Sequence, residues 1–211
     1  MTTPTLHCFA QSGNAYKAAL MLDLCGAPWK PVFVDFFNGE ARGSDYREIN
    51  EMGEVPTYTE GALRLTQSGV ILDYLAEKHG RFGPASADER REILRWLLWD
   101  NHKLTGSIAS ARFLQLYLPE KHRKPDVIAF LMGRARAALK VLDQRLEGRA
   151  FILGDSPTIA DLSCAGYIWF LEEIDIEPPS HVAAWRERLQ ALPGWRHAYD
   201  CMPGHPLPEA D

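Results

Sequence analysis

Two short segments on either side of a predicted β-hairpin have the residue types needed to hold a small anion. Val55-Pro56 comes directly before residues 57–60, and Gln67-Ser68 comes directly after residues 63–66. These two runs alternate in polarity around a Gly-Ala pair, which predicts a hairpin. Apolar residues at helical spacing follow Ser68, so the polar pair lies where a helix begins. Because a helix N-terminus carries free N–H groups, a small negatively charged group could bind between the two segments.

The elements that would position these segments alternate between strand and helix through residue 80. Strands are predicted at residues 5–9 and 32–34, and helices at residues 14–25 and 68–79. The polar, glycine-rich stretch at residues 37–50 has weak helical character at best. Together with the hairpin, the order βαβαββα predicts an α+β domain with one mixed four-stranded sheet covered by helices.

A second domain is predicted to be entirely helical. Residues 81–87 have the composition of a linker, and strand signals stop after them. Apolar residues then recur at helical spacing over residues 89–117, 125–146, 156–173, 181–191 and 195–201. We therefore expect a first domain at residues 1–80, a helical domain at residues 88–205 and an irregular tail at residues 206–211.

The composition is that of an ordinary soluble globular protein. Of the 211 residues, 46% are hydrophobic and 24% charged, and the net charge of -5 argues against a nucleic-acid or anionic-membrane partner. No apolar run approaches the roughly 20 residues of a membrane span, and the first residues lack a signal-peptide pattern. The cysteines are too scattered for a disulfide framework or a metal site, so we expect a cytoplasmic protein without metal. They are Cys8, Cys25, Cys164 and Cys201.

Four motifs, in the right order and on the right elements, resemble the cytosolic glutathione transferase family over nearly the whole chain. The resemblance implies a thioredoxin-like N-terminal domain that binds glutathione, an all-α C-terminal domain and a homodimer. The motifs are Ser12-Gly-Asn14 after the first strand, Gly53-Glu-Val-Pro56 before the hairpin, Gln67-Ser68 before the third helix, and Gly154-Asp-Ser-Pro-Thr158-Ile-Ala-Asp161 in the second domain. The last contains a possible capping box and is expected to act in folding.

The resemblance implies how glutathione would be bound. A cis Pro56 would turn the Val55 backbone outward to pair with the peptide-like ligand in strand fashion. The Ser68 hydroxyl and N–H would bind the γ-glutamyl carboxylate, and Gln67 would bind the γ-glutamyl ammonium. The alternatives are an ordinary trans turn at Pro56 and a Ser68 that merely caps its own helix.

Catalysis would require the glutathione thiolate, because a thiol is a poor nucleophile. Ser12 is the first candidate for the donor that stabilises the sulfur anion, and Asn14 is the second. Related bacterial proteins use Ser, Cys or Thr-x-Asn here. The absence of a cysteine at this point counts against a covalent mixed-disulfide mechanism. Ser12 and Asn14 could instead be only helix caps.

Other candidates for binding are less specific. Many relatives have Lys or Gln where this chain has Glu54, whose carboxylate could meet the ligand ammonium or point to solvent. Arg42 is a candidate for the glycyl carboxylate of glutathione. Trp99, His102, Lys103 and Arg112 in the second domain could line a cleft for the second substrate, although a core or solvated position fits each of them as well.

The sequence therefore predicts a glutathione transferase. The thiolate of bound glutathione would attack a hydrophobic electrophile or a peroxide in a cleft lined by mostly apolar faces at residues 99–110 and 111–117. Glutathione would be a co-substrate, with no other cofactor. The alternatives are a glutathione-dependent disulfide reductase or cis-trans isomerase, and a non-catalytic binding or regulatory module of the same fold.

Overall fold

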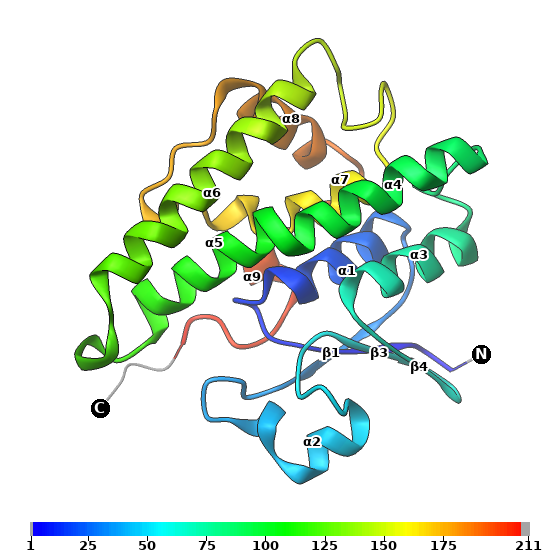
Figure 1. The fold of residues 1–211 in the computed structure, drawn as a ribbon. Helices are drawn as coiled ribbons and strands as arrows, with labels where there is room; N and C mark the ends of the chain where they lie inside the picture. Colours follow the sequence, from blue (N-terminus) through cyan, green and yellow to red (C-terminus); the bar gives the residue numbers. More distant parts are fainter. Residues whose placement is uncertain (1, 208–211) are drawn as a thin grey trace. The chain divides into compact units, whose positions relative to one another are not determined.

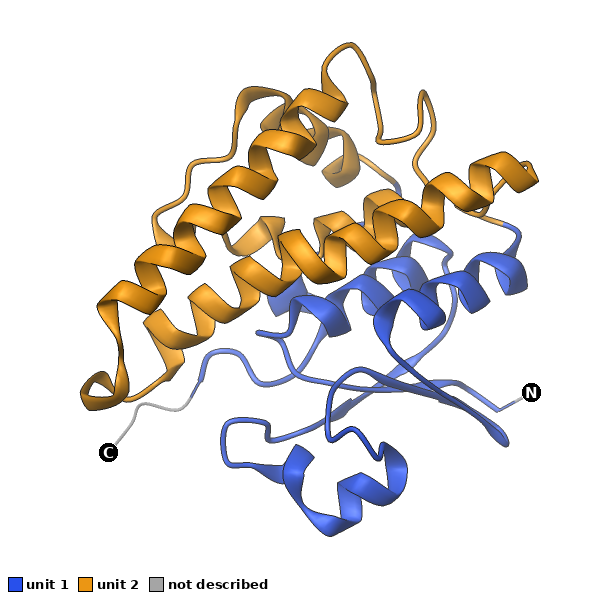
Figure 2. Cartoon of the chain, viewed as in Figure 1, with its two compact units in different colours: residues 1–80, 193–211 blue, residues 81–192 orange. Residues whose placement is uncertain are grey.

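A computed structural model describes residues 2–207 of the chain, which form two compact units (Figure 2). The first unit holds the chain through Gly80 and again from Pro193 onward, and the second holds Arg81–Leu192. The prediction that residues 193–205 belong to the helical domain is therefore wrong. This segment packs on the first unit, where the Tyr16 hydroxyl donates to the Arg196 carbonyl over 2.6 Å. Of the predicted tail, residues 208–211 lie outside the described residues.

The first unit contains the predicted mixed four-stranded sheet. Its strand order is β2-β1-β3-β4, with β1 parallel to β2 and antiparallel to β3, and with β3 antiparallel to β4. Helices α1 and α3 lie on one side of the sheet and α2 lies on the other (Figure 1). The elements are β1 (Thr5–Cys8), α1 (Gly13–Leu24), β2 (Lys30–Phe33), α2 (Ser44–Ile49), β3 (Thr57–Glu60), β4 (Leu63–Thr66), α3 (Ser68–His79) and α9 (Ala198–Cys201).

Alternation along β1 explains why the sheet has a buried face. Leu6 and Cys8 are fully buried, while Thr5 and His7 are half-buried and point to the opposite face. Helix α1 packs against β1 and α3 and is buried along almost its whole length, which is why its sequence is apolar around most of its circumference.

The stretch at residues 37–50 is more regular than its sequence indicates. It forms a 3-10 turn at Glu40–Arg42 and then helix α2. Tyr46 is the buried residue of this short helix, and it packs with Val34 and Ala41 in a small core of its own. Six residues are too few for a helical period to appear in the sequence, so tertiary packing stabilises α2.

The second unit is helical, as predicted, but its helices are more interrupted than expected. The run from Ala87 to Tyr117 is continuous, with π-helical turns at Asp100–Leu104 and Phe113–Tyr117. The helix expected over residues 156–173 is only seven residues long and continues as 3-10 turns. The helices are α4 (Ala87–Trp99), α5 (Thr105–Arg112), α6 (Pro125–Leu146), α7 (Ile159–Ala165) and α8 (Ser180–Gln190).

The predicted capping box at the start of α7 is confirmed. The Thr158 hydroxyl accepts from the Ala160 N–H, and the Thr158 N–H donates to Asp161 over 2.9 Å. Asp161 is fully buried and also accepts from the Ile152 N–H and the Trp185 indole N–H. Within residues 2–207, no helix is both long and apolar enough to cross a membrane.

Candidate functional site

The sheet register brings three loops to the same end of the first unit. His7 in β1 is paired with Thr57 in β3, and Thr57 is paired with Thr66 in β4. Because both pairings are antiparallel, the exit from β1, the entrance to β3 and the exit from β4 lie side by side. These are the segments that contain Ser12, Val55-Pro56 and Gln67-Ser68.

The turn before β3 presents an unpaired backbone. The Val55–Pro56 peptide bond is cis, as the resemblance implies. In the part of the chain that the structure describes, neither the N–H nor the C=O of Val55 makes a hydrogen bond. An extended peptide could therefore pair with both groups in the manner of an added strand.

Two residues that the sequence analysis missed hold this turn in place. The Tyr46 hydroxyl and the Asn50 side-chain amide both donate to the Glu54 carbonyl, over 3.0 and 2.7 Å. Gly53 has a φ of 65°, and a Cβ at this position would lie 2.8 Å from the Ala41 carbonyl oxygen. An aromatic residue in the interior of the polar stretch at 37–50 was the available signal for Tyr46.

The N-terminus of α3 has unused donors. The N-cap is Gln67, with a φ of 65° and no side-chain capping bond, so the interpretation that Ser68 merely caps its own helix is wrong. Ser68 is buried, and among the described residues its hydroxyl and N–H have no partner, nor does the Gly69 N–H. Two N–H groups and one hydroxyl are thus available to an anion.

Glu54 and Gln67 lie together at the outer edge of this end of the sheet. The Gln67 amide nitrogen donates to the Glu54 carboxylate over 3.1 Å, and both side chains are exposed. The Glu54 carboxylate is thus hydrogen-bonded to a residue of the β4–α3 junction. Both side chains carry oxygen acceptors on which an ammonium group could be bound.

The start of α1, the third of the three segments at this end of the sheet, also supplies hydrogen-bond donors. Ser12 is the N-cap of α1, and its Oγ accepts from the Ala15 N–H over 3.1 Å. A hydroxyl that accepts in this way still has its proton to donate, so capping and ligand binding are compatible. Asn14 is within the first turn, and its buried Oδ1 has no partner among the described residues. The N–H groups of Gly13 and Asn14 are also unpaired there.

The cysteines do not provide an activated thiol near these loops. Cys8 and Cys201 are buried, and burial raises the pKa of each thiol to about 12. Both are therefore protonated at neutral pH and are poor nucleophiles. Any thiolate at this site would have to belong to a ligand.

The remaining predicted residues have different surroundings. Arg42 is exposed at the end of its 3-10 turn and has no carboxylate or carbonyl partner within the described residues. His102 and Lys103 are exposed, and Trp99 is half-buried against Trp96. Arg112 is 2% exposed; it donates to Glu173 over 2.7 Å, and its guanidinium lies over the Phe170 ring. That these four line a cleft stays a prediction.

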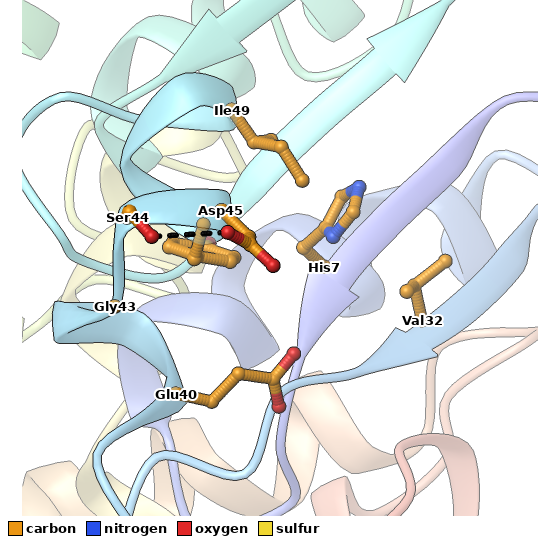
Figure 3. Close-up of a pocket in the computed structure, with 8 residues that line it drawn as sticks. His7, Val32, Glu40, Gly43, Ser44, Asp45 and Ile49 are labelled. Atoms are coloured by element: carbon orange, nitrogen blue, oxygen red, sulfur yellow. Dashed lines mark hydrogen bonds between the residues drawn. The ribbon is translucent and has the colours of Figure 1, made fainter.

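A separate pocket lies on the α2 side of the sheet (Figure 3). It measures about 450 Å³ and is lined by none of the residues predicted from the sequence. The His7 imidazole lines this pocket together with the side chains of Glu40 and Asp45. Burial lowers the pKa of His7, although the nearby Glu40 carboxylate acts in the opposite direction. The imidazole is therefore neutral at pH 7.

Comparisons with known proteins agree on one family. The models for the glutathione S-transferase N-terminal and C-terminal domains match residues 4–77 and 125–200. The disulfide-bond oxidoreductase YfcG of Escherichia coli (strain K12) is 27% identical over 198 residues, which are 88% of this chain and 89% of that protein.

Solved structures give the same result. A possible glutathione S-transferase from Rhodopseudomonas palustris has a TM-score of 0.88 and 30% identity, covering 96% of this chain and 92% of the other. A glutathione transferase from Burkholderia graminis, solved with two glutathione molecules bound per subunit, has a TM-score of 0.81 and 25% identity over 91% and 85% of the two chains.

Proposed function

Because the chain belongs to the glutathione S-transferase family, we propose that it binds glutathione and holds its thiol as a thiolate for attack on a hydrophobic electrophile or a peroxide. The observation that carries the proposal is the set of unpaired donors and acceptors on the three converging loops. Among the described residues, the Val55 N–H and C=O and the first N–H groups of α1 and α3 have no hydrogen-bond partner, and the Ser12 hydroxyl, which accepts from the Ala15 N–H, still has its proton to donate. A tripeptide with a carboxylate at one end and a thiol in the middle matches these groups.

Each part of glutathione has a complementary partner in this proposal. The cysteinyl backbone pairs with the N–H and C=O of Val55. The γ-glutamyl carboxylate is bound by Ser68 and the neighbouring N–H of α3, while its ammonium meets Gln67 and Glu54. Arg42 is the residue we propose for the glycyl carboxylate, since its guanidinium is exposed and unpaired among the described residues.

The sulfur lies at the start of α1 in this proposal. A free cysteine thiol has a pKa of about 8.5, and lowering it by one unit requires about 1.4 kcal/mol of differential stabilisation. The Ser12 hydroxyl and the first N–H groups of α1 supply this through charge-assisted hydrogen bonds and the helix dipole. Asn14 is the second donor.

The thiolate then reacts without help from a protein thiol. With an electrophilic carbon, a C–S bond forms and the leaving group departs with its electron pair. With a hydroperoxide, the thiolate attacks the terminal oxygen and the O–O bond breaks, which gives a sulfenic acid and releases the other oxygen as an alcohol. A second glutathione then reacts with the sulfenic acid to give glutathione disulfide and water. We propose that the apolar faces at residues 99–117, with Trp99, His102 and Lys103, bind the second substrate; Arg112 is buried in its ion pair with Glu173 and is not part of this proposal.

A second candidate function is supported by a specific relative. YfcG is named a disulfide-bond oxidoreductase. In this chain, Ser12-Gly-Asn14 carries donors but no cysteine, so a disulfide would be reduced by two glutathione molecules. The first glutathione thiolate attacks one sulfur and releases the other as a thiolate, which leaves a mixed disulfide with glutathione. The second glutathione thiolate attacks the glutathione sulfur of this mixed disulfide, which forms glutathione disulfide and releases the second thiolate of the substrate.

Three enzyme assays with one set of variants test these functions. Wild type, Ser12→Ala and Asn14→Ala are compared on an aryl halide, cumene hydroperoxide and a small disulfide, with Ser180→Ala as control because Ser180 is exposed at the start of α8. We expect Ser12→Ala to lower kcat/KM about 10- to 100-fold, because a hydrogen bond to a charged group contributes roughly 1.5–3 kcal/mol and each 1.4 kcal/mol is a factor of ten. The pKa of bound thiol should rise toward its free value.

The outcomes separate the candidate functions. A loss confined to Asn14→Ala would exchange the two roles. Turnover of the disulfide alone would favour the reductase, and glutathione binding without any turnover would favour the non-catalytic module. Failure of the wild type to bind glutathione would refute the proposal as a whole.

We also propose that the protein is a cytoplasmic homodimer. Family membership supports the dimer, and the four free cysteines agree with a reducing compartment. Sedimentation equilibrium of the purified chain would measure twice the mass of one chain, and a single-chain mass at micromolar concentration would contradict the dimer.

A further inference from the structure

The segment at residues 193–207, here called the C-terminal strap, follows α1 from its C-terminal end back to its N-terminal end. At the far end, Gly194 approaches so closely that a Cβ there would lie 2.6 Å from the Asp23 carbonyl oxygen. The Arg196 guanidinium makes two bonds to the Asp23 carboxylate, of 3.0 and 2.7 Å. Nearer the N-terminus of α1, the Tyr16 hydroxyl donates to the Arg196 carbonyl. The strap is thus fixed along the helix that Ser12 caps.

The strap ends at the turn that carries Ser12. The Ser12 N–H donates to the Phe9 carbonyl over 3.0 Å, so Ala10 and Gln11 are the central residues of this turn. Both are bonded to the strap: the Ala10 N–H donates to the Pro203 carbonyl over 2.8 Å, and the Gln11 side-chain amide donates to the Gly204 carbonyl over 2.7 Å. These two bonds span more than 190 residues of sequence.

The strap itself has a defined conformation at this point. Gly204 has a φ of 92°, and a Cβ would lie 2.6 Å from the Phe33 ring. One residue later, the His205 ring stacks on Tyr199, with centroids 3.7 Å apart and planes within 1°. A glycine conformation and two ring contacts therefore determine where the Pro203 and Gly204 carbonyls point.

We propose that the C-terminal strap positions the thiolate donor, with Gln11 and Gly204 as positioning residues that act through the turn at Ala10 and Gln11. The proposal rests on the proposed function, in which Ser12 donates to the glutathione sulfur. The two central residues of the turn are hydrogen-bonded to the strap, and the last residue of the turn, Ser12, carries the hydroxyl. Loss of the strap contacts would let Ser12 move relative to the ligand, whose other parts are held by Val55 and Ser68.

The first test changes Gln11 to methionine, which keeps the length of the side chain and removes its amide. Gln144→Met is the matched control, because Gln144 is exposed on α6. We expect glutathione affinity within about twofold of wild type, a bound-thiol pKa raised by about half a unit to one unit, and a kcat lowered about three- to tenfold, since a small misplacement weakens a donor to a charged atom. Gln144→Met should change none of these.

The second test changes a residue of the strap itself, Gly204. Gly204→Ala forces a side chain against Phe33, whereas Gly148→Ala has a similar φ of 69° and nothing within 4 Å. Both variants bear the cost of alanine at positive φ, so only the first displaces the strap. Hydrogen exchange of the Ala10 and Ser12 amides should be faster in Gly204→Ala and in Gln11→Met, and unchanged in the two controls.

The results distinguish this proposal from the proposed function. If Gln11→Met loses stability and activity together while the bound-thiol pKa stays at the wild-type value, the strap is only structural and the positioning role is refuted. Unchanged exchange at Ala10 in Gln11→Met would refute the strap contact itself. If wild type binds no glutathione or leaves its thiol pKa unshifted, the proposed function fails, while hydrogen exchange still reports whether the strap holds the turn.

Discussion

Gly53 lies against the Ala41 carbonyl, just before the turn that we propose binds glutathione, and alanine at this position gives a quantitative test of that close approach. Two costs arise. The backbone has a φ of 65°, and the added Cβ would lie 2.8 Å from the Ala41 carbonyl oxygen. Because this oxygen is a backbone atom and Ala41 is fully buried, it cannot move away as a flexible side chain would.

A matched variant separates the two costs. Gly26 has a φ of 63° and no atom within 4 Å of an added Cβ. In Gly26→Ala the free energy of unfolding should therefore fall only by the conformational cost of alanine in the left-handed region, about 1–2 kcal/mol. In Gly53→Ala it should fall by this amount and by a further 1–3 kcal/mol, about the cost of overpacking at a site that cannot relax. Urea unfolding of both variants and wild type measures the difference in the free energy of unfolding.

The same pair tests the link from this turn to the ligand. If the turn shifts to relieve the contact, the backbone of Val55, which is two residues after Gly53, moves with it. Glutathione affinity should then fall about tenfold, equivalent to 1.4 kcal/mol. Calorimetric titration should find Gly26→Ala at wild-type affinity. Equal losses of stability in the two variants, with glutathione affinity unchanged in Gly53→Ala, would refute the reasoning.

Two further predictions concern buried and paired carboxylates. Asp161→Ala removes the acceptor of three buried N–H groups and should cost roughly 3–5 kcal/mol in urea unfolding, so a variant of near wild-type stability would contradict this role. Lys78, and to a lesser degree two tyrosine hydroxyls, lowers the pKa of Glu60, so its stabilisation is present above the unfolded pKa and is lost as pH falls through the folded one. The stability gap between wild type and Lys78→Gln should therefore be largest at neutral pH and shrink below about pH 4; a gap independent of pH would count against the pair.

Local patterns made much of the first unit predictable. Alternation over residues 57–60 and 63–66 gave the hairpin, and the hairpin fixes which residues lie beside each other at its open end. The position of Ser68 at a helix start followed from the apolar spacing after it, and α3 begins at Ser68. Short-range signals of this kind are sufficient when an element and its turn are adjacent in sequence.

The parts that could not be predicted depend on contacts between distant residues. Helix α2 is stabilised by the burial of Tyr46, and the Tyr46 bond to Glu54 is visible only in three dimensions. Gln11 gave no sequence signal, because its partner is the carbonyl of Gly204. The early end of α7 is different, because Gly166 stands directly after its last helical residue, Ala165, and a glycine at that position is a sequence signal for the end of a helix.

The return of residues 193–207 to the first unit also has a consequence for the order in which the protein can be made. Domains generally fold as units, beginning with the N-terminal part while the rest is still being synthesised. Here the first unit is discontinuous, and the entire helical unit is translated between its two pieces. The turn before Ser12 therefore acquires its hydrogen bonds to the strap only after Pro203 and Gly204 have been translated. The first unit in isolation would have to be built as a circular permutant, in which residues 193–207 are joined ahead of β1.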